Sequence, residues 1–379
     1  MMSTNTVEVA ILGGGLLGWS AGYRLARAGR SVLVIDALEP GTATNAGAGI
    51  IAPGTSVRIN DESIDIFSAA VDYYPRLLAE LAADGETNTG YATVGSLFVA
   101  RNDDDAAKLP AVLDLMERRR DAGMGNIGEA QLVTGAEARE LFPALSDLPG
   151  AVLSTGPARV NGRLMRDSLR AAAEKHGAKL AIGKGSIVTD GSRATGVLVN
   201  GETIAAEQVL ICGGAWSAAL GEQLGVFLDL YPQRGQILHI DMEGQDTSAW
   251  PILTGYHSHY ILTFPTSRVV CGATREHDSG FDPSFTAGGM HEVLSQAFEI
   301  ADGLRVGKIA EWRVGLRPFA RDEMPILGEV PGWSNIYVAT GHGPSGLQLG
   351  PVSGAGVADL MLGSRPRFDL SPFSAERFG

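Results

Sequence analysis

The stretch Val7-Glu-Val-Ala-Ile-Leu-Gly-Gly-Gly-Leu-Leu-Gly18 decides the fold of this 379-residue chain. Residues 7–12 predict a buried strand, and Gly13, Gly15 and Gly18 follow it in Gly-x-Gly-x-x-Gly spacing. Gly13 permits a tight turn, Gly15 lets a pyrophosphate touch the backbone, and Gly18 lets the next helix pack closely on the sheet. The start of that helix offers unpaired N–H groups and a partial positive charge to phosphates.

A second apolar run, residues 31–35, ends at the carboxylate of Asp36. A carboxylate in this place accepts hydrogen bonds from both ribose hydroxyls and disfavours a 2′-phosphate. Because the chain has 50 glycines, the triplet alone has little weight, and a plain βα turn without a ligand is its alternative. The complete unit of strand, turn, helix, strand and acid predicts a dinucleotide site for FAD or NAD.

Length and composition indicate an ordinary globular protein, long enough for two domains. Apolar residues make up 45% of the chain and charged residues 19%, which predicts a packed core. The formal net charge of −13 disfavours nucleic acid as a partner, because such a site needs a basic face. A local contact with a membrane surface is left open.

Cysteine usage and the first residues bear on the compartment. Cys212 and Cys271 lie in apolar runs, so we expect buried free thiols and no disulfide. Residues 1–6 lack a basic segment followed by an apolar core, and the longer apolar runs are broken by glycine. We therefore expect no secretory signal, no membrane span and a soluble cytoplasmic protein.

Hydrophobic periodicity predicts an α/β chain in which strands and helices alternate. Further helices are expected at 62–83, 104–122, 162–176, 292–301 and 347–362, and strands at 92–101, 179–182, 196–199, 207–212, 236–240, 260–264, 269–273 and 336–339. Asn161 is expected to cap the helix at 162–176, and Gly95 to bend the strand at 92–101. The glycines within 347–362 predict a helix buried against the sheet, since each costs about 1 kcal/mol against alanine.

Three segments combine small residues with a place beside a strand end. Residues 40–56 follow the nucleotide-binding unit, and we favour contact with a large flat ligand over a plain loop. Residues 213–217 and 341–346 are glycine-rich turns between a strand and a helix, which suit close approach of a backbone to a ligand.

Several blocks in order resemble the FAD-dependent family of D-amino-acid oxidases, glycine oxidases and D-amino-acid dehydrogenases. They are the opening fingerprint with Asp36, Asn45-Ala-Gly-Ala-Gly-Ile-Ile51, Cys212-Gly-Gly-Ala-Trp-Ser217, Arg234-Gly-Gln236, Gly315-Leu-Arg-Pro318 followed by Asp322 and Pro325-Ile-Leu-Gly328, and Gly341-His-Gly-Pro-Ser-Gly346. The resemblance implies a Rossmann-like FAD-binding domain of discontinuous segments and a β-sheet substrate domain. The FAD-binding domain would comprise 1–88, 150–226 and 308–379, and the substrate domain 89–149 and 227–307.

The residues that the resemblance places at FAD lie in the glycine turns and the loop after the second strand. They are Gly13, Gly15, Leu16, Leu17, Gly18, Asp36, Ala37, Thr44, Asn45, Ala46, Gly47, Ala48, Gly49, Ile50, Lys184, Gly213, Gly214, Trp216, Gly315, Arg317, Gly343, Pro344, Ser345, Gly346, Leu347 and Gln348. Some relatives, such as sarcosine oxidases, hold flavin through a cysteine near the C-terminal turn. This chain has no cysteine after Cys271, so FAD is expected to be non-covalent.

Arg317 is the first candidate catalytic residue. A guanidinium holds a carboxylate by two parallel hydrogen bonds, and the matching arginine of the family grips the substrate carboxylate. The alternative is a structural salt bridge to Asp322 or Glu323.

Tyr260 and His342 are the other two candidate catalytic residues. The resemblance points the Tyr260 hydroxyl at the substrate, whereas an ordinary strand tyrosine is the alternative. His342 lies in the turn expected beside the flavin, where it acts directly or only braces the turn. His257 and His259 are two residues apart, but no cysteine or acid cluster supports a metal site there.

The expected reaction is oxidation of the C–N bond of a D-amino acid, glycine, or an N-substituted or cyclic amino acid. Hydride transfer to flavin N5 would give an imino acid, and oxygen or a quinone would accept the electrons. The alternatives are an FAD oxidoreductase of a non-amino-acid substrate and a non-catalytic dinucleotide-binding subunit. A homo-oligomer is left open.

Overall fold

The opening stretch folds as strand, glycine turn, helix and strand in the computed structural model, which describes residues 6–56 and 64–379. β1 (Thr6–Leu12) leads into α1 (Leu16–Arg27), and β2 (Val32–Asp36) follows. β1 lies between β2 and β12 (Glu202–Ile211) and is parallel to both. Helices and loops cover both faces of these strands, which explains why β1 and β2 are nearly continuous apolar runs.

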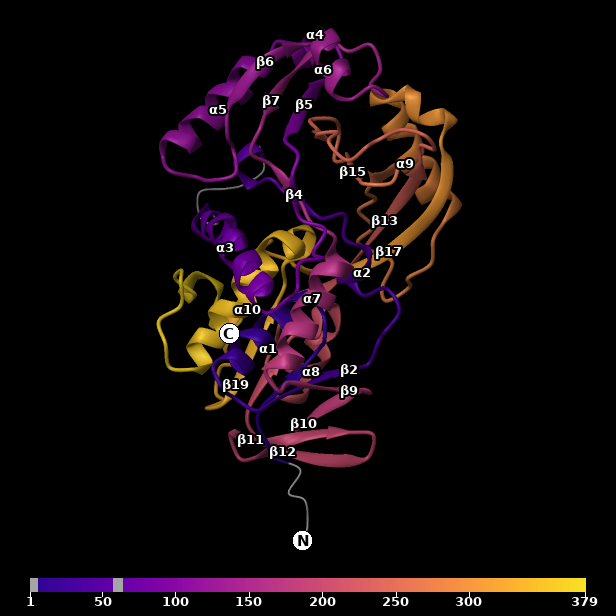
Figure 1. The fold of residues 1–379 in the computed structure, drawn as a ribbon. Helices are drawn as coiled ribbons and strands as arrows, with labels where there is room; N and C mark the ends of the chain where they lie inside the picture. The colour runs from indigo at the N-terminus through magenta and orange to yellow at the C-terminus, as the bar shows by residue number, and fades with distance from the viewer. Residues whose placement is uncertain (1–5, 57–63) are drawn as a thin grey trace.

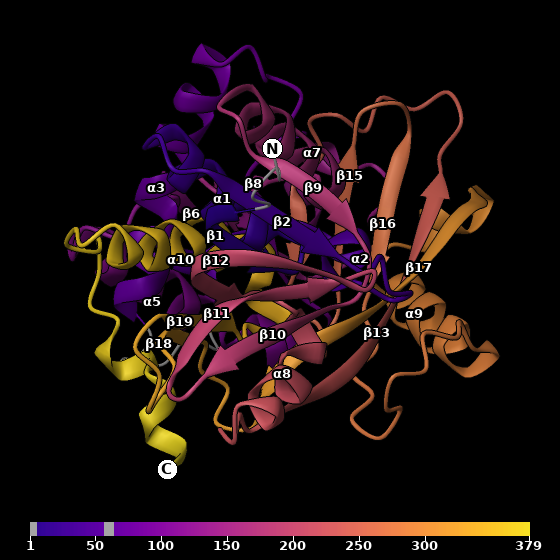
Figure 2. The same cartoon turned by 90° about the horizontal axis from the view of Figure 1, so that it is seen from below.

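The first sheet gathers strands from distant parts of the sequence (Figures 1 and 2). Within the described residues its order is β10-β11-β12-β1-β2-β9, with β19 beside the second half of β12 and β18 beside β19. Its other strands are β9 (Lys179–Ile182), β10 (Gly185–Asp190), β11 (Arg193–Val199), β18 (Ile326–Glu329) and β19 (Ile336–Thr340). The predicted α/β fold is confirmed.

A layer of helices covers one face of this sheet: α1, α3 (Ile64–Ala83), α7 (Gly162–Lys175) and α10 (Gly346–Met361). The small residues of α10 allow a close crossing with α1. A Cβ on Gly354 would lie 2.6 Å from the backbone oxygen of Leu17. The expected burial of this glycine-containing helix is therefore confirmed. Asn161 caps α7 as expected, because its side chain accepts from the backbone N–H groups of Arg163 and Leu164.

The second sheet has the order β17-β13-β16-β15-β14-β5-β7-β6 in the described part of the chain. All its neighbouring strands are antiparallel except β14 and β5. Its strands are β5 (Ser96–Ala100), β6 (Ala130–Thr134), β7 (Gly150–Ser154), β13 (Leu230–Asp241), β14 (Ile252–Thr254), β15 (Tyr260–Phe264), β16 (Arg268–Gly272) and β17 (Lys308–Ala320).

The two faces of the second sheet have different neighbours. Leu238 and Ile261 pack with Val293 of α9 (Ala287–Ile300) in one apolar cluster. On the opposite face, Ile237 and other buried side chains pack against the loop that carries Ala48 and Ile50. This second face therefore looks toward the predicted ligand-binding loop.

The remaining elements are mostly shorter. They are β3 (Ile50–Ile51), β4 (Ala92–Thr93) and β8 (Ala158–Arg159), which form a small sheet, the helices α2 (Ala43–Ala46), α4 (Asp103–Ala106), α5 (Leu109–Asp121), α6 (Gly135–Leu141) and α8 (Ser217–Gln223), and the 3-10 helices η1 (Pro53–Thr55), η3 (Gly214–Trp216), η4 (Asp302–Val306), η5 (Gly343–Ser345), η6 (Ser371–Phe373) and η7 (Ala375–Phe378). None of the helices in the described ranges is both long enough and apolar enough to cross a bilayer.

Several expected elements differ from the observed ones. The single helix predicted over 104–122 was wrong: α4 and α5 are separate, and α5 starts at Leu109 with Pro110 in its first turn, where proline is tolerated. The strand expected at 92–101 is broken at Gly95, whose φ of +74° bends the chain as predicted. The helix expected at 292–301 starts earlier, at a cap formed by Thr286. Residues 62 and 63 of the expected 62–83 helix lie outside the described residues.

The division of the chain into five domain segments stays a prediction. β7 and β17 fall in the ranges 150–226 and 308–379, which were expected in the FAD-binding domain, yet both strands pair within the second sheet. Cys212 and Cys271 are buried free thiols, as predicted.

Candidate active site

A cavity of about 360 Å³ opens at the carboxyl ends of the parallel strands of the first sheet. Open α/β sheets bind ligands in this place. Residues after β1, β2, β12 and β19 line one part of it, and the β17 segment 316–318 lines another. Its volume lies within the 300–1,000 Å³ that is usual for small-ligand pockets.

The glycines of the opening turn are held in place by tight packing. Gly13 has a φ of +117°, and a Cβ there would lie 2.2 Å from the backbone oxygen of Cys212. A Cβ on Gly18 would lie 1.9 Å from the backbone oxygen of Gly13. Gly15 lines the cavity itself, and the nearest atom to its missing Cβ is Thr44 Oγ1, 3.3 Å away. Two of the three glycines therefore close the turn, and Gly15 leaves room for a ligand.

Asp36 stands at the cavity wall with both carboxylate oxygens anchored. Oδ2 accepts a 2.9 Å hydrogen bond from the backbone N–H of Gly14, and Oδ1 accepts one of 2.8 Å from that of Leu38. A carboxylate has about four acceptor positions, so two remain for ribose hydroxyls. Together with the bare backbone at Gly15, this donor and acceptor set fits an adenosine diphosphate portion of FAD.

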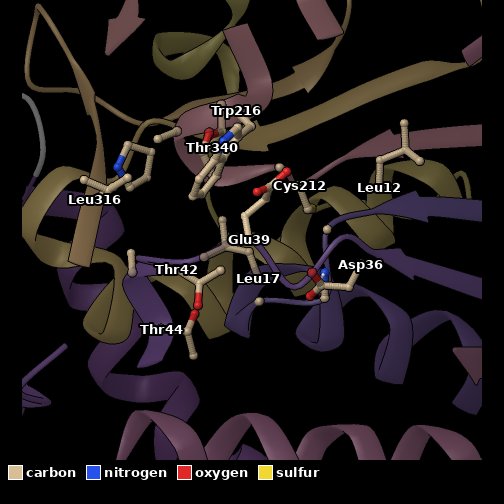
Figure 3. Close-up of a pocket in the computed structure, with 18 of the residues that line it drawn as sticks. Leu12, Leu17, Asp36, Glu39, Thr42, Thr44, Cys212, Trp216, Leu316 and Thr340 are labelled. Carbon is tan, nitrogen blue, oxygen red and sulfur yellow. Dashed lines mark hydrogen bonds between the residues drawn. The ribbon is translucent and has the colours of Figure 1, made fainter. Parts of the chain in front are cut away.

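The far end of the cavity joins the two sheets. In Figure 3, Asp36 lies at one side of the view, and Leu316, Trp216 and Thr340 lie toward the other. Backbone bridges between Thr42 and Leu316 and between Phe319 and His342 hold β17 against the loop after β2 and the turn after β19.

Arg317 projects from β17 at this end. Its Nη1 donates to Gln233 Oε1 at 2.9 Å and to the backbone oxygen of Thr274 at 3.0 Å. Its guanidinium lies over Gly235, where a Cβ would come within 2.3 Å of Nη2. Burial lowers the pKa of Arg317, but an arginine keeps its charge.

The salt bridge that was the alternative for Arg317 is not formed. Asp322 instead pairs with Arg377 at 2.6 Å, and no carboxylate in residues 6–56 or 64–379 lies within 4.0 Å of the Arg317 guanidinium nitrogens. The cavity therefore ends at a half-buried cation that is held by neutral acceptors.

Tyr260 lies on the same sheet face as Arg317. Gln233 of β13 is paired with Arg317, and residues that are paired across strands project to the same face. Ile237 lies four residues further along β13, on the same face as Gln233. It is paired with Gly272, which is paired in turn with Tyr260. A Cβ on Gly272 would lie 2.9 Å from the Tyr260 hydroxyl oxygen. Burial raises the pKa of Tyr260, and the charge of Arg317 opposes that rise. Tyr260 does not line the cavity.

His342 lines the cavity and has a partner in α10. Its Nε2 lies 2.9 Å from Ser353 Oγ. Burial lowers the pKa of His342 to about 3, so the imidazole is neutral at pH 7. The hydrogen bond ties the turn after β19 to the helix that follows it.

The cavity brings together 17 of the residues predicted at FAD. They are Gly13, Gly15, Leu16, Leu17, Asp36, Ala37, Thr44, Gly47, Lys184, Gly213, Gly214, Trp216, Arg317, Gly343, Pro344, Gly346 and Leu347. Their contact with FAD stays a prediction.

The other predicted residues do not line the cavity: Gly18, Asn45, Ala46, Ala48, Gly49, Ile50, Gly315, Ser345 and Gln348. Some of them support its walls. The Gln348 side chain accepts from the backbone N–H of Ala52, and a Cβ on Gly315 would lie 2.8 Å from Ala46 Cβ. The role of these residues at FAD also stays a prediction.

Sequence reasoning missed several lining residues, including Leu12, Gly14 and Thr340. Leu12 and Thr340 are the last residues of β1 and β19, so the rule that ligands bind at the carboxyl ends of strands could have found them. His257 and His259 lie within 3.0 and 3.3 Å of Glu299 and Glu292. No group of three or more potential metal ligands converges within the described part of the chain.

The fold and the cavity define a nucleotide-binding oxidoreductase whose ligand site spans two sheets. Residues 8–360 match the family model described as FAD dependent oxidoreductase, and the chain belongs to that family. This confirms the resemblance and the assignment of FAD as the cofactor.

Relatives of known sequence cover almost the whole chain. An uncharacterized oxidoreductase, YurR of Bacillus subtilis (strain 168), is 40% identical over 96% of this chain and 97% of its own. A glycine oxidase of Geobacillus kaustophilus (strain HTA426) is 29% identical over 99% and 98%. The crystal structure of iminodiacetate oxidase from Chelativorans sp. BNC1 superposes with a TM-score of 0.93 at 38% identity, over 97% of this chain and 98% of that one.

Proposed function

We propose that this chain oxidises the C–N bond of a small amino acid or N-substituted amino acid to the imino acid. The observation that carries the proposal is Arg317, a half-buried cation at the end of the cavity that is held by Gln233 and Thr274 and by no carboxylate in the described ranges. A non-catalytic nucleotide-binding subunit would have no use for such a group. A substrate carboxylate supplies the missing negative charge.

The hydrogen bonds of Arg317 indicate how the carboxylate binds. Both N–H groups of Nη1 are directed at Gln233 and Thr274. The N–H of Nε and one N–H of Nη2 then form the edge that can hold both carboxylate oxygens in parallel. Because Nη1 is fixed, this edge has one orientation, and it sets the direction of the substrate's α carbon.

The other residues have holding roles. Asp36 and the backbone at Gly15 would hold the nucleotide part of FAD, and the turn that His342 ties to Ser353 would bound the flavin end. Bound FAD supplies a two-electron acceptor for the hydride that leaves the substrate's α carbon. The nitrogen lone pair then forms the C=N bond, and water hydrolyses the imino acid to an oxo acid and an amine. Tyr260 would add one hydroxyl donor near the carboxylate.

The relatives guide the choice of substrate and acceptor. The substrates that name the glycine oxidase and the iminodiacetate oxidase share one pattern: a carboxylate is attached to the carbon atom of the C–N bond. Glycine and iminodiacetate are therefore the first two substrates to test. Oxygen is the proposed electron acceptor because both relatives are named oxidases. The cytoplasmic location, the non-covalent attachment of FAD and a homo-oligomeric state stay predictions from the sequence.

Anaerobic mixing of the FAD-loaded protein with glycine, iminodiacetate, sarcosine and D- and L-amino acids tests the proposal. Bleaching of the flavin absorbance by one of these supports it, and rapid recovery in air identifies oxygen as the acceptor. Recovery only with a quinone would leave the substrate class in place and change the acceptor. If polyol phosphates bleach the flavin and no amino acid does, the proposal is overturned.

A further inference from the structure

We propose that His277 and Gln233 position Arg317, and that a positive charge on His277 weakens carboxylate binding at Arg317. Arg317 is the residue of the proposed function, so this inference rests on that proposal. His277 lies on the segment after β16, and Gln233 lies on β13 directly beside Arg317 in the register.

Three hydrogen bonds link these residues in a line. Arg317 Nη1 lies 2.9 Å from Gln233 Oε1, and Gln233 Nε2 lies 3.1 Å from His277 Nε2. His277 Nδ1 lies 2.7 Å from the Tyr231 hydroxyl. Gln233 is 1% exposed whereas His277 is exposed, so the line runs from solvent through a buried amide to the half-buried guanidinium.

The direction of each hydrogen bond follows from Arg317. A guanidinium only donates, so the oxygen of the Gln233 amide must face it and the NH₂ group must face His277. His277 Nε2 must then accept and carry no proton. The ring proton therefore lies on Nδ1 and is donated to Tyr231. This arrangement holds only while His277 is neutral.

Protonation of His277 breaks the sequence of donors and acceptors. Nε2 then carries a proton that faces the NH₂ group of Gln233, and two donors oppose each other. Reversal of the amide would satisfy His277 but would turn the NH₂ group toward Nη1 of Arg317. The reversal therefore costs Arg317 its 2.9 Å acceptor, and the edge that binds the carboxylate then loses its fixed orientation.

Aromatic rings contact His277, and charged groups surround its partner Tyr231. Tyr231 and Phe319 contact its ring at centroid distances of 5.9 and 5.5 Å. The charged groups around Tyr231 are Arg321, whose guanidinium lies 5.0 Å from the Tyr231 ring centroid, together with Asp229, Asp278 and Glu323. Histidine is the side chain that ordinarily changes charge between about pH 5 and 8. Gln233 itself does not titrate.

Acetate binding to the FAD-loaded protein tests the inference separately from turnover. The dissociation constant of acetate is measured by the change in flavin absorbance between about pH 6 and pH 8, where acetate stays ionised. We expect binding to be about tenfold weaker at the lower pH, the effect of one lost hydrogen bond to a charged group. His277→Gln keeps an acceptor for Gln233 at every pH, so its acetate affinity should match the wild type at pH 8 and stay constant.

Two further variants complete the test. His291→Gln changes an exposed histidine of α9, on the opposite face of the sheet, and should keep the wild-type pH dependence. Gln233→Leu removes the acceptor and should bind acetate weakly at both pH values. With an amino-acid substrate, the same pH dependence should appear in kcat/KM and be absent from His277→Gln.

The outcomes separate this inference from the proposed function. A pH-dependent acetate affinity that His277→Gln abolishes supports the inference, even if none of the tested amino acids is oxidised. An acetate affinity that is constant with pH in the wild type overturns the inference, and so does a full pH dependence in His277→Gln. Equal acetate affinity in the wild type and in Arg317→Ala overturns it together with the carboxylate site.

Discussion

Replacement of Arg317 measures how much of the reaction depends on a fixed carboxylate. In the structure Nη1 is occupied by Gln233 and Thr274, so the edge formed by Nε and Nη2 provides two charge-assisted hydrogen bonds to the substrate. Each is worth about 1.5–3 kcal/mol, so Arg317→Ala should lose about 3–6 kcal/mol of transition-state binding. That corresponds to a fall in kcat/KM of about 10²- to 10⁴-fold.

The assay is the rate of flavin reduction after anaerobic mixing with the substrate. Arg317→Lys is the matched variant, because lysine keeps the positive charge but cannot form the two parallel hydrogen bonds of a guanidinium. Its activity should lie between those of the wild type and Arg317→Ala. FAD content and thermal unfolding are measured on each protein to show that the cavity is intact. A kcat/KM of Arg317→Ala within about threefold of the wild type, with FAD bound, would refute the reasoning.

Three further predictions concern the cavity walls. Gly18→Ala places a Cβ 1.9 Å from the backbone oxygen of Gly13, so we expect at least about 2 kcal/mol loss in the free energy of unfolding and weak FAD binding. Asp36→Asn removes the charge and one acceptor while it can keep the bond from Gly14, so the dissociation constant of FAD from the apoprotein should rise about tenfold. His342 has a pKa of about 3 when folded and an ordinary one when unfolded, so stability is complete above about pH 6.5 and falls as the pH decreases toward 3. His342→Gln should lose less unfolding free energy than the wild type between about pH 7.5 and 5.5, measured by urea denaturation.

Each of these predictions has a contrary result. Gly22→Ala is the control for Gly18→Ala, since its Cβ would make ordinary contacts at 3.5 Å or more; equal effects of the two would contradict the packing argument. An unchanged FAD dissociation constant in Asp36→Asn would remove Asp36 from the nucleotide site. Equal loss of stability in His342→Gln and the wild type would mean that His342 does not stay neutral in the fold.

The sequence predicted most strands of the first sheet from local signals, whereas β10 and β18 were not predicted. β1, β2, β9 and β19 are mainly apolar, and β12 ends in an apolar run. Each of these five is parallel to a neighbour, as in a βαβ unit. The glycine turns at the carboxyl ends of these strands were found for the same reason. Many of the predicted cofactor residues that line the cavity lie in or directly after these turns.

The second sheet was harder to predict because its long strands depend on partners far away in sequence. β17 combines arginines, glycine and Pro318 in one strand, a composition that does not favour a strand. It is stable because β13 pairs with it over the whole length, from Leu230 with Ala320 to Asp241 with Lys308. The contact between Gln233 and Arg317 arises from this register, so Gln233 could not be identified from the sequence alone.

The register also explains why two sequence blocks of the family occur together. Gly315 and Gly235 are opposite each other on β17 and β13, and both lie on the face that looks toward the first sheet. Ala46 of α2 packs where a Gly315 side chain would be, and the Arg317 guanidinium lies where a Gly235 side chain would be. Because neither glycine has a side chain, Ala46 of α2 and the Arg317 guanidinium can lie next to each other on this face. A side chain on either glycine would separate the two, which is why these glycines belong to the site even though neither lines the cavity.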